Sequence, residues 1–180
     1  FDVFKEPCLF VTLTDNGVDA YPLTTIEGGY YIDGDSAYIK LSSGEIVRYH
    51  TDEYTSIDTD IPDLPYITSY KFNNKYNPNL NQDVIGTITD SIIELELNAI
   101  GKSLTASFKL SDSEAIAYVG NEQQTSKETR NRFDKSVKYT ITYPRYNVVS
   151  GAEKKPFGRI YTINTTWPKS KVARIDIDIE

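Results

Sequence analysis

Apolar and polar residues alternate along much of this chain with a period of two, which is typical of half-buried β-strands. The clearest example is IIELEL at residues 92–97. Its second isoleucine and both leucines are expected to face a core, while Glu94 and Glu96 face solvent. Similar runs at residues 137–143 and 159–165 are expected to form two strands that pair with each other.

Short apolar runs and turn signals predict a meander of about four strands near the N-terminus. The first run covers residues 7–14, and Asp33-Gly34 is a hairpin dipeptide between two tyrosine-rich arms. Residues 52–65 hold five acidic residues and two prolines without periodicity, so they are expected to form an acidic linker. Residues 1–65 are therefore predicted to be a small β-meander unit that ends in this linker.

The same patterning predicts a β-sandwich over residues 66–167. Within it, residues 111–136 show no apolar stripe at helical spacing. We expect them to be irregular, with a hairpin arm at 117–119 and one helical turn near 127–132. The C-terminal segment, residues 168–180, contains an alternating run that predicts a further strand, which could pair with the N-terminal unit.

The composition and net charge of the chain limit the classes of molecule that it could bind. The chain has 180 residues, a net charge of −7 and a pI near 4.8, which argues against nucleic acid because phosphate binding requires clustered Lys and Arg. The single cysteine, Cys8, excludes an intrachain disulfide and a cysteine-rich metal site, and its apolar neighbours predict a buried thiol. No apolar run approaches the roughly 20 residues of a transmembrane helix. The sequence starts at Phe1 and has no Met, so it could lack an N-terminal signal that the native chain carries.

Patterns for catalysis or metal binding are sparse. His50 is the single histidine, and without a second His or Cys we expect no metal site and no cofactor. Glu94 and Glu96 would project from one strand face about 7 Å apart, a spacing that overlaps that of inverting glycosidases. The simpler interpretation is the polar face of an amphipathic strand, so we expect no catalytic residues.

Carbohydrate binding is better supported than catalysis, because aromatic faces combined with amide and carboxylate groups hold sugars. The candidate ligand-binding residues are Tyr30, Tyr31, Tyr146 and Trp167. Tyrosine is also a good strand residue with an amphipathic body, so each tyrosine could instead be structural. Trp167 could instead pack at a junction between the two units.

Several segments between residues 66 and 166, taken in order, resemble a known module. They read ITSYKF, NPNLNQDVIGTI, LTASFKLSDSEAIAYV, QQTS, RFDKSVKYTIT and RIYTINT. This order is similar to that of the DUF5018-type Ig-like β-sandwich module of Bacteroidetes surface lipoproteins. Two features depart from the family: residues 144–158 form a much longer loop than its last hairpin, and residues 1–65 have no counterpart.

The resemblance implies an Ig-like sandwich in an exported protein of the cell surface or outer membrane and periplasm, held to the membrane only by a lipid anchor upstream of Phe1. We therefore expect an all-β fold, a small N-terminal β-meander plus an Ig-like antiparallel β-sandwich. The leading function is a non-enzymatic cell-surface module whose ligand could be a glycan. The alternative is a structural or adhesive module that binds another surface protein, and a glycan hydrolase ranks third.

Overall fold

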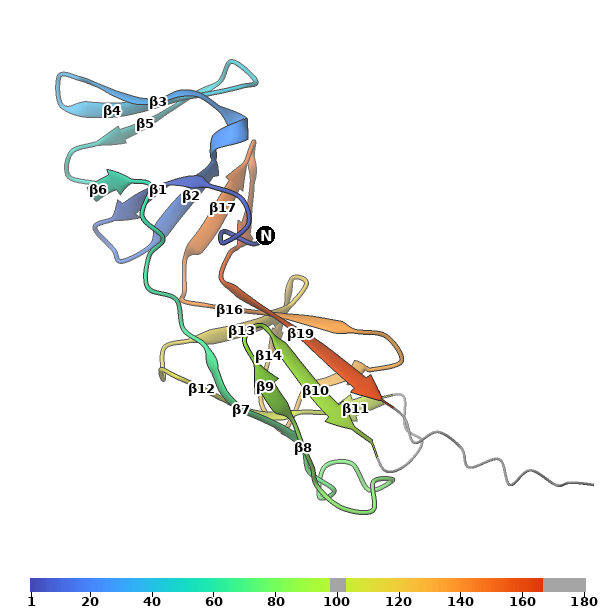
Figure 1. Cartoon of the computed structure of the whole chain (residues 1–180). Helices are drawn as coiled ribbons and strands as arrows, with labels where there is room; N and C mark the ends of the chain where they lie inside the picture. The colour runs from blue at the N-terminus through green and yellow to red at the C-terminus, as the bar shows by residue number, and fades with distance from the viewer. Residues whose placement is uncertain (98–102, 167–180) are drawn as a thin grey trace, which may run out of the picture.

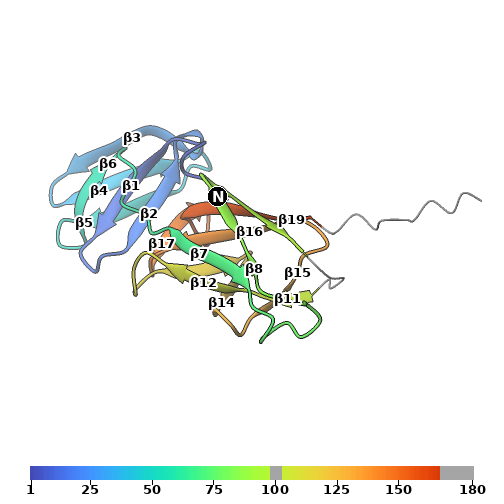
Figure 2. The same ribbon diagram turned by 60° about the horizontal axis from the view of Figure 1, so that its bottom comes forward.

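The computed structural model describes residues 1–97 and 103–166, which are almost entirely β-structure, as predicted. Two β-units lie end to end (Figure 1), and Figure 2 shows the same arrangement from another side. Within the described ranges the only helical element is the short 3-10 turn η1 (Leu23–Thr25). None of the described segments forms a helix with the length and apolarity needed to cross a membrane.

The sandwich encloses one apolar core between a six-stranded sheet and smaller sheets. The large sheet has the order β14-β13-β16-β19-β10-β9, and the smaller sheets have the orders β12-β7-β8 and β11-β15. The strands of these sheets are β7 (Ile67–Phe72), β8 (Val84–Ile85), β9 (Thr87–Thr89), β10 (Ile92–Glu96), β11 (Ser103–Thr105), β12 (Ser107–Leu110), β13 (Ile116–Val119), β14 (Glu122–Gln124), β15 (Arg130–Arg132), β16 (Val137–Thr142) and β19 (Arg159–Thr166).

Strand β10 and the residue after it follow the predicted alternation. Ile93, Leu95 and Leu97 are at most 1% exposed, whereas Glu94 and Glu96 are exposed. Strands β16 and β19 pair antiparallel, as predicted, but β10 pairs with β19 in parallel. The sheet is therefore mixed rather than purely antiparallel, because alternation specifies the buried face of a strand and not the direction of its neighbour.

Residues 111–136 are more regular than expected. The predicted hairpin arm is confirmed as β13, which pairs with β14 around Gly120. The predicted helical turn is wrong, because Lys127 has a φ of 72° and residues 130–132 form β15, which pairs with β11. Strand pairing overrides the helix propensity of the Glu, Lys and Arg side chains in this segment.

The N-terminal unit consists of the sheets β18-β17-β2-β1-β6 and β3-β4-β5. Its strands are β1 (Cys8–Leu13), β2 (Val18–Pro22), β3 (Ile26–Asp33), β4 (Ser36–Leu41), β5 (Ile46–His50), β6 (Tyr54–Asp58), β17 (Tyr146–Ser150) and β18 (Glu153–Pro156). Strand β1 is buried on both faces, since Leu9 and Val11 enter one apolar core while Cys8 and Phe10 enter another. Burial raises the pKa of the Cys8 thiol to about 11, in agreement with the predicted buried cysteine.

The predicted acidic linker is only partly a linker. Residues 54–58 form β6, which pairs antiparallel with β1, so that the connection between the units shrinks to residues 59–66. Even there Leu64 is buried in the N-terminal unit. Strand β6 is an edge strand, where charged residues are common, and this explains why its sequence resembles a solvated connection.

The predicted loop at residues 144–158 is a β-hairpin. Strands β17 and β18 pair antiparallel, and β17 adds in parallel to β2 of the N-terminal unit. Val148 and Val149 enter the two different N-terminal cores. The chain thus leaves the sandwich after β16, completes the N-terminal sheet, and returns as β19 (Figure 1). The N-terminal unit is therefore discontinuous in sequence.

Candidate functional site

Two of the predicted ligand residues, Tyr30 and Tyr31, lie next to each other on the edge strand β3. They are 43% and 51% exposed. Neighbouring residues of a strand project to opposite sides, so the two rings do not form one platform. Tyr31 stacks on Tyr38 of β4, with ring centroids 5.2 Å apart. One face of the Tyr31 ring is therefore already occupied.

The other two predicted residues are elsewhere. Tyr146 lies in the junction between the units, where its ring stacks on Phe157 with centroids 5.5 Å apart and meets the edge of Tyr143. Trp167 lies outside the described residues. The structure therefore does not gather the tyrosines of the predicted set into one site.

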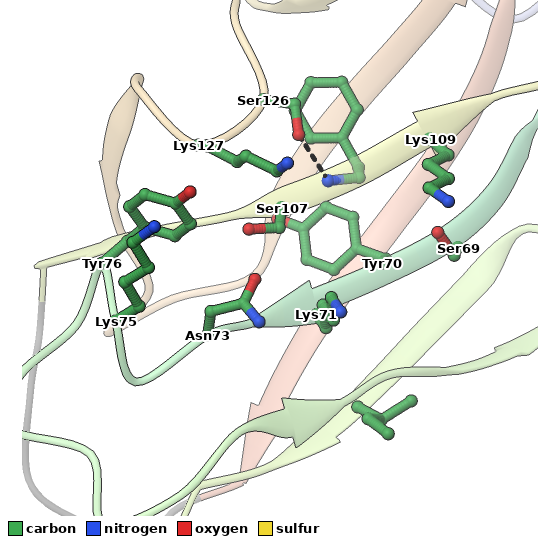
Figure 3. Close-up of a pocket in the computed structure, with 12 residues that line it drawn as sticks. Ser69, Tyr70, Lys71, Asn73, Lys75, Tyr76, Ser107, Lys109, Ser126 and Lys127 are labelled. Carbon is green, nitrogen blue, oxygen red and sulfur yellow. Dashed lines mark hydrogen bonds between the residues drawn. The ribbon is translucent and has the colours of Figure 1, made fainter.

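A different group of residues does form a cleft, with a volume of about 530 Å³, over the small sheet β12-β7-β8 (Figure 3). Period-two alternation places Ser69, Lys71 and Asn73 on one side of β7 and its extension. The register sets Ser107 of β12 opposite Lys71, and Lys109 opposite Ser69. Side chains of two strands that are remote in sequence thus form one lining.

The cleft is bounded by the loops that follow β7 and β14. The Ser126 Oγ accepts a hydrogen bond from the Phe108 backbone N–H at 2.8 Å, and the Lys127 N–H donates to the Ala106 carbonyl. On the other side, the Lys75 ammonium lies 5.5 Å from the centroid of the Tyr76 ring. Figure 3 shows Lys75 and Lys127 on the Tyr76 side of the cleft and Lys109 on the opposite side.

The floor combines aromatic rings with two buried hydroxyls, those of Tyr70 and Ser107, that have no hydrogen-bond partner among the described residues. Tyr70 and Phe108 line the cleft and stack at 6.3 Å, and Tyr70 packs edge-on against Tyr139 in the sandwich core. Burial raises the pKa of the Tyr70 phenol well above its usual value, so it stays neutral. Ser107 is 3% exposed, and its Oγ has no hydrogen-bond partner among the described residues. A buried polar atom of this kind is costly to leave unpaired.

A second hollow of about 860 Å³ contains the glutamates considered for hydrolysis. Glu94 and Glu96 line it together with Asp83, whose carboxylate accepts hydrogen bonds from the Asn73 side chain and the Asn74 backbone N–H. Both glutamates are exposed on the outer face of β10. This placement agrees with their predicted role as the polar face of an amphipathic strand.

The N-terminal unit holds a buried polar cluster. Asp19 is 3% exposed, and its carboxylate accepts a hydrogen bond of 2.6 Å from the Tyr49 hydroxyl. The Lys154 ammonium of the inserted hairpin lies 3.5 Å from the other oxygen, and the Tyr49 and Tyr21 hydroxyls are in contact. Burial raises the pKa of Tyr21 to about 12 and that of Tyr49 further. Each of these groups has a partner, so the cluster is best understood as a tie between strands.

Metal ligands are not clustered. Within residues 1–97 and 103–166, no three His, Cys, Asp or Glu side chains are placed to hold a metal ion. His50 ends β5, and its ring nitrogens lie 2.9 Å from Asp35 and 2.6 Å from Asp52. These hydrogen bonds to the two carboxylates raise the pKa of the exposed imidazole.

The lysine-rimmed cleft was missed at the sequence level. The sequence did show part of this pattern, since Ser69, Lys71 and Asn73 place polar side chains at alternate positions. The β7–β12 register and the folding of the loop at Ser126 and Lys127 onto β12 could not be read from that pattern.

Comparison with family models, curated proteins and solved structures found no match to this chain. The resemblance to the DUF5018-type module therefore stays a prediction.

Proposed function

We propose that this chain is a non-enzymatic binding module of an exported, lipid-anchored surface protein, and that its ligand is a carbohydrate held in the cleft over β7 and β12. The observation that carries the proposal is the composition of that cleft. Aromatic side chains lie beside serine hydroxyls and an asparagine side chain in one concavity of about 530 Å³. Pockets of this size, with a few polar groups among apolar ones, are typical ligand sites.

The chemistry of the lining suits a sugar. Tyr76 is half-buried at the rim and Phe108 is half-buried at the floor, so each has exposed ring surface for the C–H face of a pyranose. Ser69 and Ser107 supply hydroxyls that can both donate and accept hydrogen bonds. Ser69, Ser107 and Phe108 stand on the paired strands β7 and β12, which makes this part of the site pre-organised.

Export and lipid anchoring are proposed from the family resemblance. The alternative, a module that binds another surface protein, is favoured by one observation. Tyr30, Tyr31 and Ile32 are exposed on β3, whose outer edge has no paired strand among the described residues, and such an edge can accept an added strand.

A glycan array tests the carbohydrate proposal. The protein should bind a defined subset of glycans. Tyr76→Ala should weaken that binding about two- to tenfold, since an aromatic contact contributes about 0.5–1.5 kcal/mol. Tyr31→Ala, which removes an exposed aromatic ring of the other unit, is the matched control and should leave binding unchanged. An array without signal, or equal loss in both variants, would overturn the assignment to the cleft.

A further inference from the structure

We infer that the carbohydrate bound in this cleft is acidic, and that its carboxylate or sulfate groups pair with four lysines at the rim. This inference rests on the proposed carbohydrate function and specifies the class of sugar. Lys71, Lys75, Lys109 and Lys127 all line the cleft, and the lining includes no acidic residue. The chain as a whole carries 26 acidic against 19 basic residues. A lining whose charged residues are all cationic is therefore a local departure from the net negative charge of the protein.

The four lysines of the cleft take no part in the ion pairs formed among the described residues. The ion pairs that the described residues form within 4.0 Å involve a separate set of basic side chains, namely Lys5, Lys40, Arg48, His50, Arg132, Arg145, Lys154 and Lys155. None of the cleft lysines has a carboxylate partner among those residues. Their ammonium groups are therefore available to an external anion.

The lysines lie on two paired strands and on two separate loops. Lys71 and Lys109 belong to the paired strands β7 and β12, whereas Lys75 and Lys127 belong to the two loops that bound the cleft. Figure 3 shows Lys75 and Lys127 across the cleft from Lys109, with Tyr70 and Ser107 between them. A ligand lying over the Tyr70–Ser107 floor would thus have ammonium groups on both flanks.

The Ser107 hydroxyl points to a ligand independently of the charges. It is 3% exposed, lines the cleft, and has no hydrogen-bond partner among the described residues. A sugar hydroxyl or acid oxygen seated on the floor would satisfy it and remove the cost of an unpaired buried group. A buried hydroxyl without a partner is not expected in a patch of lysines on an open surface, because water would reach and satisfy it.

Like charges at the cleft would repel one another in the free protein, and an anion relieves this repulsion. Ammonium groups are point charges with three rotatable donors, and they do not require the planar geometry that favours arginine. Binding should weaken as salt increases, because exposed charges are screened at physiological ionic strength.

The test compares an acidic polysaccharide with its own neutral form. Polygalacturonate, the same polymer after reduction of its carboxyl groups, and a sulfated polysaccharide are titrated against the chain by calorimetry at low and physiological salt. Poly-glutamate is the non-sugar control. We expect an acidic polysaccharide to bind at least tenfold more tightly than the reduced polymer and poly-glutamate, and the stronger of the two acidic polymers identifies the acid group.

Two double variants assign the binding to the cleft. Lys71→Gln with Lys109→Gln should weaken binding on the order of tenfold, since exposed ion pairs contribute up to about 1 kcal/mol each. Lys135→Gln with Lys138→Gln makes the same change in net charge at exposed positions outside the cleft, and should leave affinity nearly unchanged. Equal losses in the two variants would overturn the inference.

The outcomes separate the two proposals. If neither polygalacturonate nor the sulfated polysaccharide binds more tightly than the reduced polymer, the acidic specificity is overturned and the carbohydrate function is left standing. If no polysaccharide binds, both proposals fail. If poly-glutamate binds as tightly as the acidic sugars, the ligand is an acidic peptide and the carbohydrate assignment is wrong.

Discussion

The two units of this protein are held together in different ways. The sandwich has one continuous apolar core that draws on β7, β10, β16 and β19. The N-terminal unit has two smaller cores, and each includes a valine from the inserted hairpin β17–β18. It also contains a buried carboxylate, Asp19, whose partners come from β5 and β18. One unit is thus specified by apolar alternation, and the other depends on a segment supplied from the sandwich sequence.

This difference has consequences for stability. A hairpin inserted between β16 and β19 can contribute to the N-terminal unit without disturbing the β16–β19 pairing. Closing the long loop between β2 and β17 carries an entropic cost, which the burial of Val148, Val149 and Phe157 must offset. The N-terminal unit should therefore be the part of the molecule that is more sensitive to changes in the hairpin.

The largest expected effect comes from Phe157→Ala. Phe157 is fully buried at the end of the hairpin and contacts Phe10 and Tyr146. Its truncation should destabilise the N-terminal unit by about 3–5 kcal/mol through lost burial and a cavity. Amide hydrogen exchange should show loss of protection in β1 and β2 while β10 and β13 stay protected.

Phe72→Ala is the matched control for that experiment. Phe72 is also fully buried, but it contacts Phe133 and Tyr70 in the sandwich core. Its loss of protection should centre on the sandwich. Equal loss of protection throughout the chain in both variants would show that the two units unfold as one cooperative body. It would contradict the view that the hairpin stabilises the N-terminal unit separately.

A smaller effect is expected from Tyr49→Phe. This change removes the hydroxyl that donates to Asp19 and contacts Tyr21, leaving a buried carboxylate with one fewer partner. The free energy of unfolding should fall by about 1–3 kcal/mol in urea denaturation. Tyr31→Phe removes an exposed hydroxyl and should change it by less than about 0.5 kcal/mol. A neutral Tyr49→Phe would show that the polar cluster does not stabilise the N-terminal unit.

The smallest effect is a pH dependence from His50. Its side-chain hydrogen bonds to Asp52 and Asp35 raise the pKa of the imidazole above its usual 6.5 in the folded protein. The protonated form therefore favours folding: the contribution is fully present below about pH 6.5 and is lost as pH rises through the folded pKa. The melting temperature should fall slightly across that window in the parent chain.

His50→Gln should abolish this slope, while an NMR titration of the imidazole in the parent chain should give a pKa above 6.5. A titration at or below 6.5 would show that the carboxylate contacts do not persist in solution. Because the group is exposed, raising the salt concentration should also reduce the effect.

Alternation was enough to predict most of the sandwich. Ile93, Leu95 and Leu97 are buried as their pattern indicates, and the pairing of β16 with β19 is confirmed. The errors occurred where pairing is remote in sequence. Within residues 54–58 only Tyr54 and Ile57 pack against the core, and this short pattern did not reveal that β6 pairs with β1. Residues 144–158 contain β17, which pairs with β2 more than a hundred residues earlier in the chain.

For the candidate site, too, the sequence showed the types of side chain but not which of them lie together. Side-chain chemistry alone led to Tyr30, Tyr31, Tyr146 and Trp167, but the structure spreads the three described tyrosines over two separate regions. The sequence did not predict that the four lysines of the cleft lie together, because they are scattered between residues 71 and 127.

The sequence by itself determined that this protein is all-β, which faces of its best strands are buried, and where many of its turns lie. These properties depend on local backbone preference and on a two-residue period that each strand carries alone. Only the tertiary structure decided that residues 146–156 complete the N-terminal sheet, and that Lys71 and Lys109 share one cleft. Both depend on strand register and on contacts between distant segments, which no local pattern encodes.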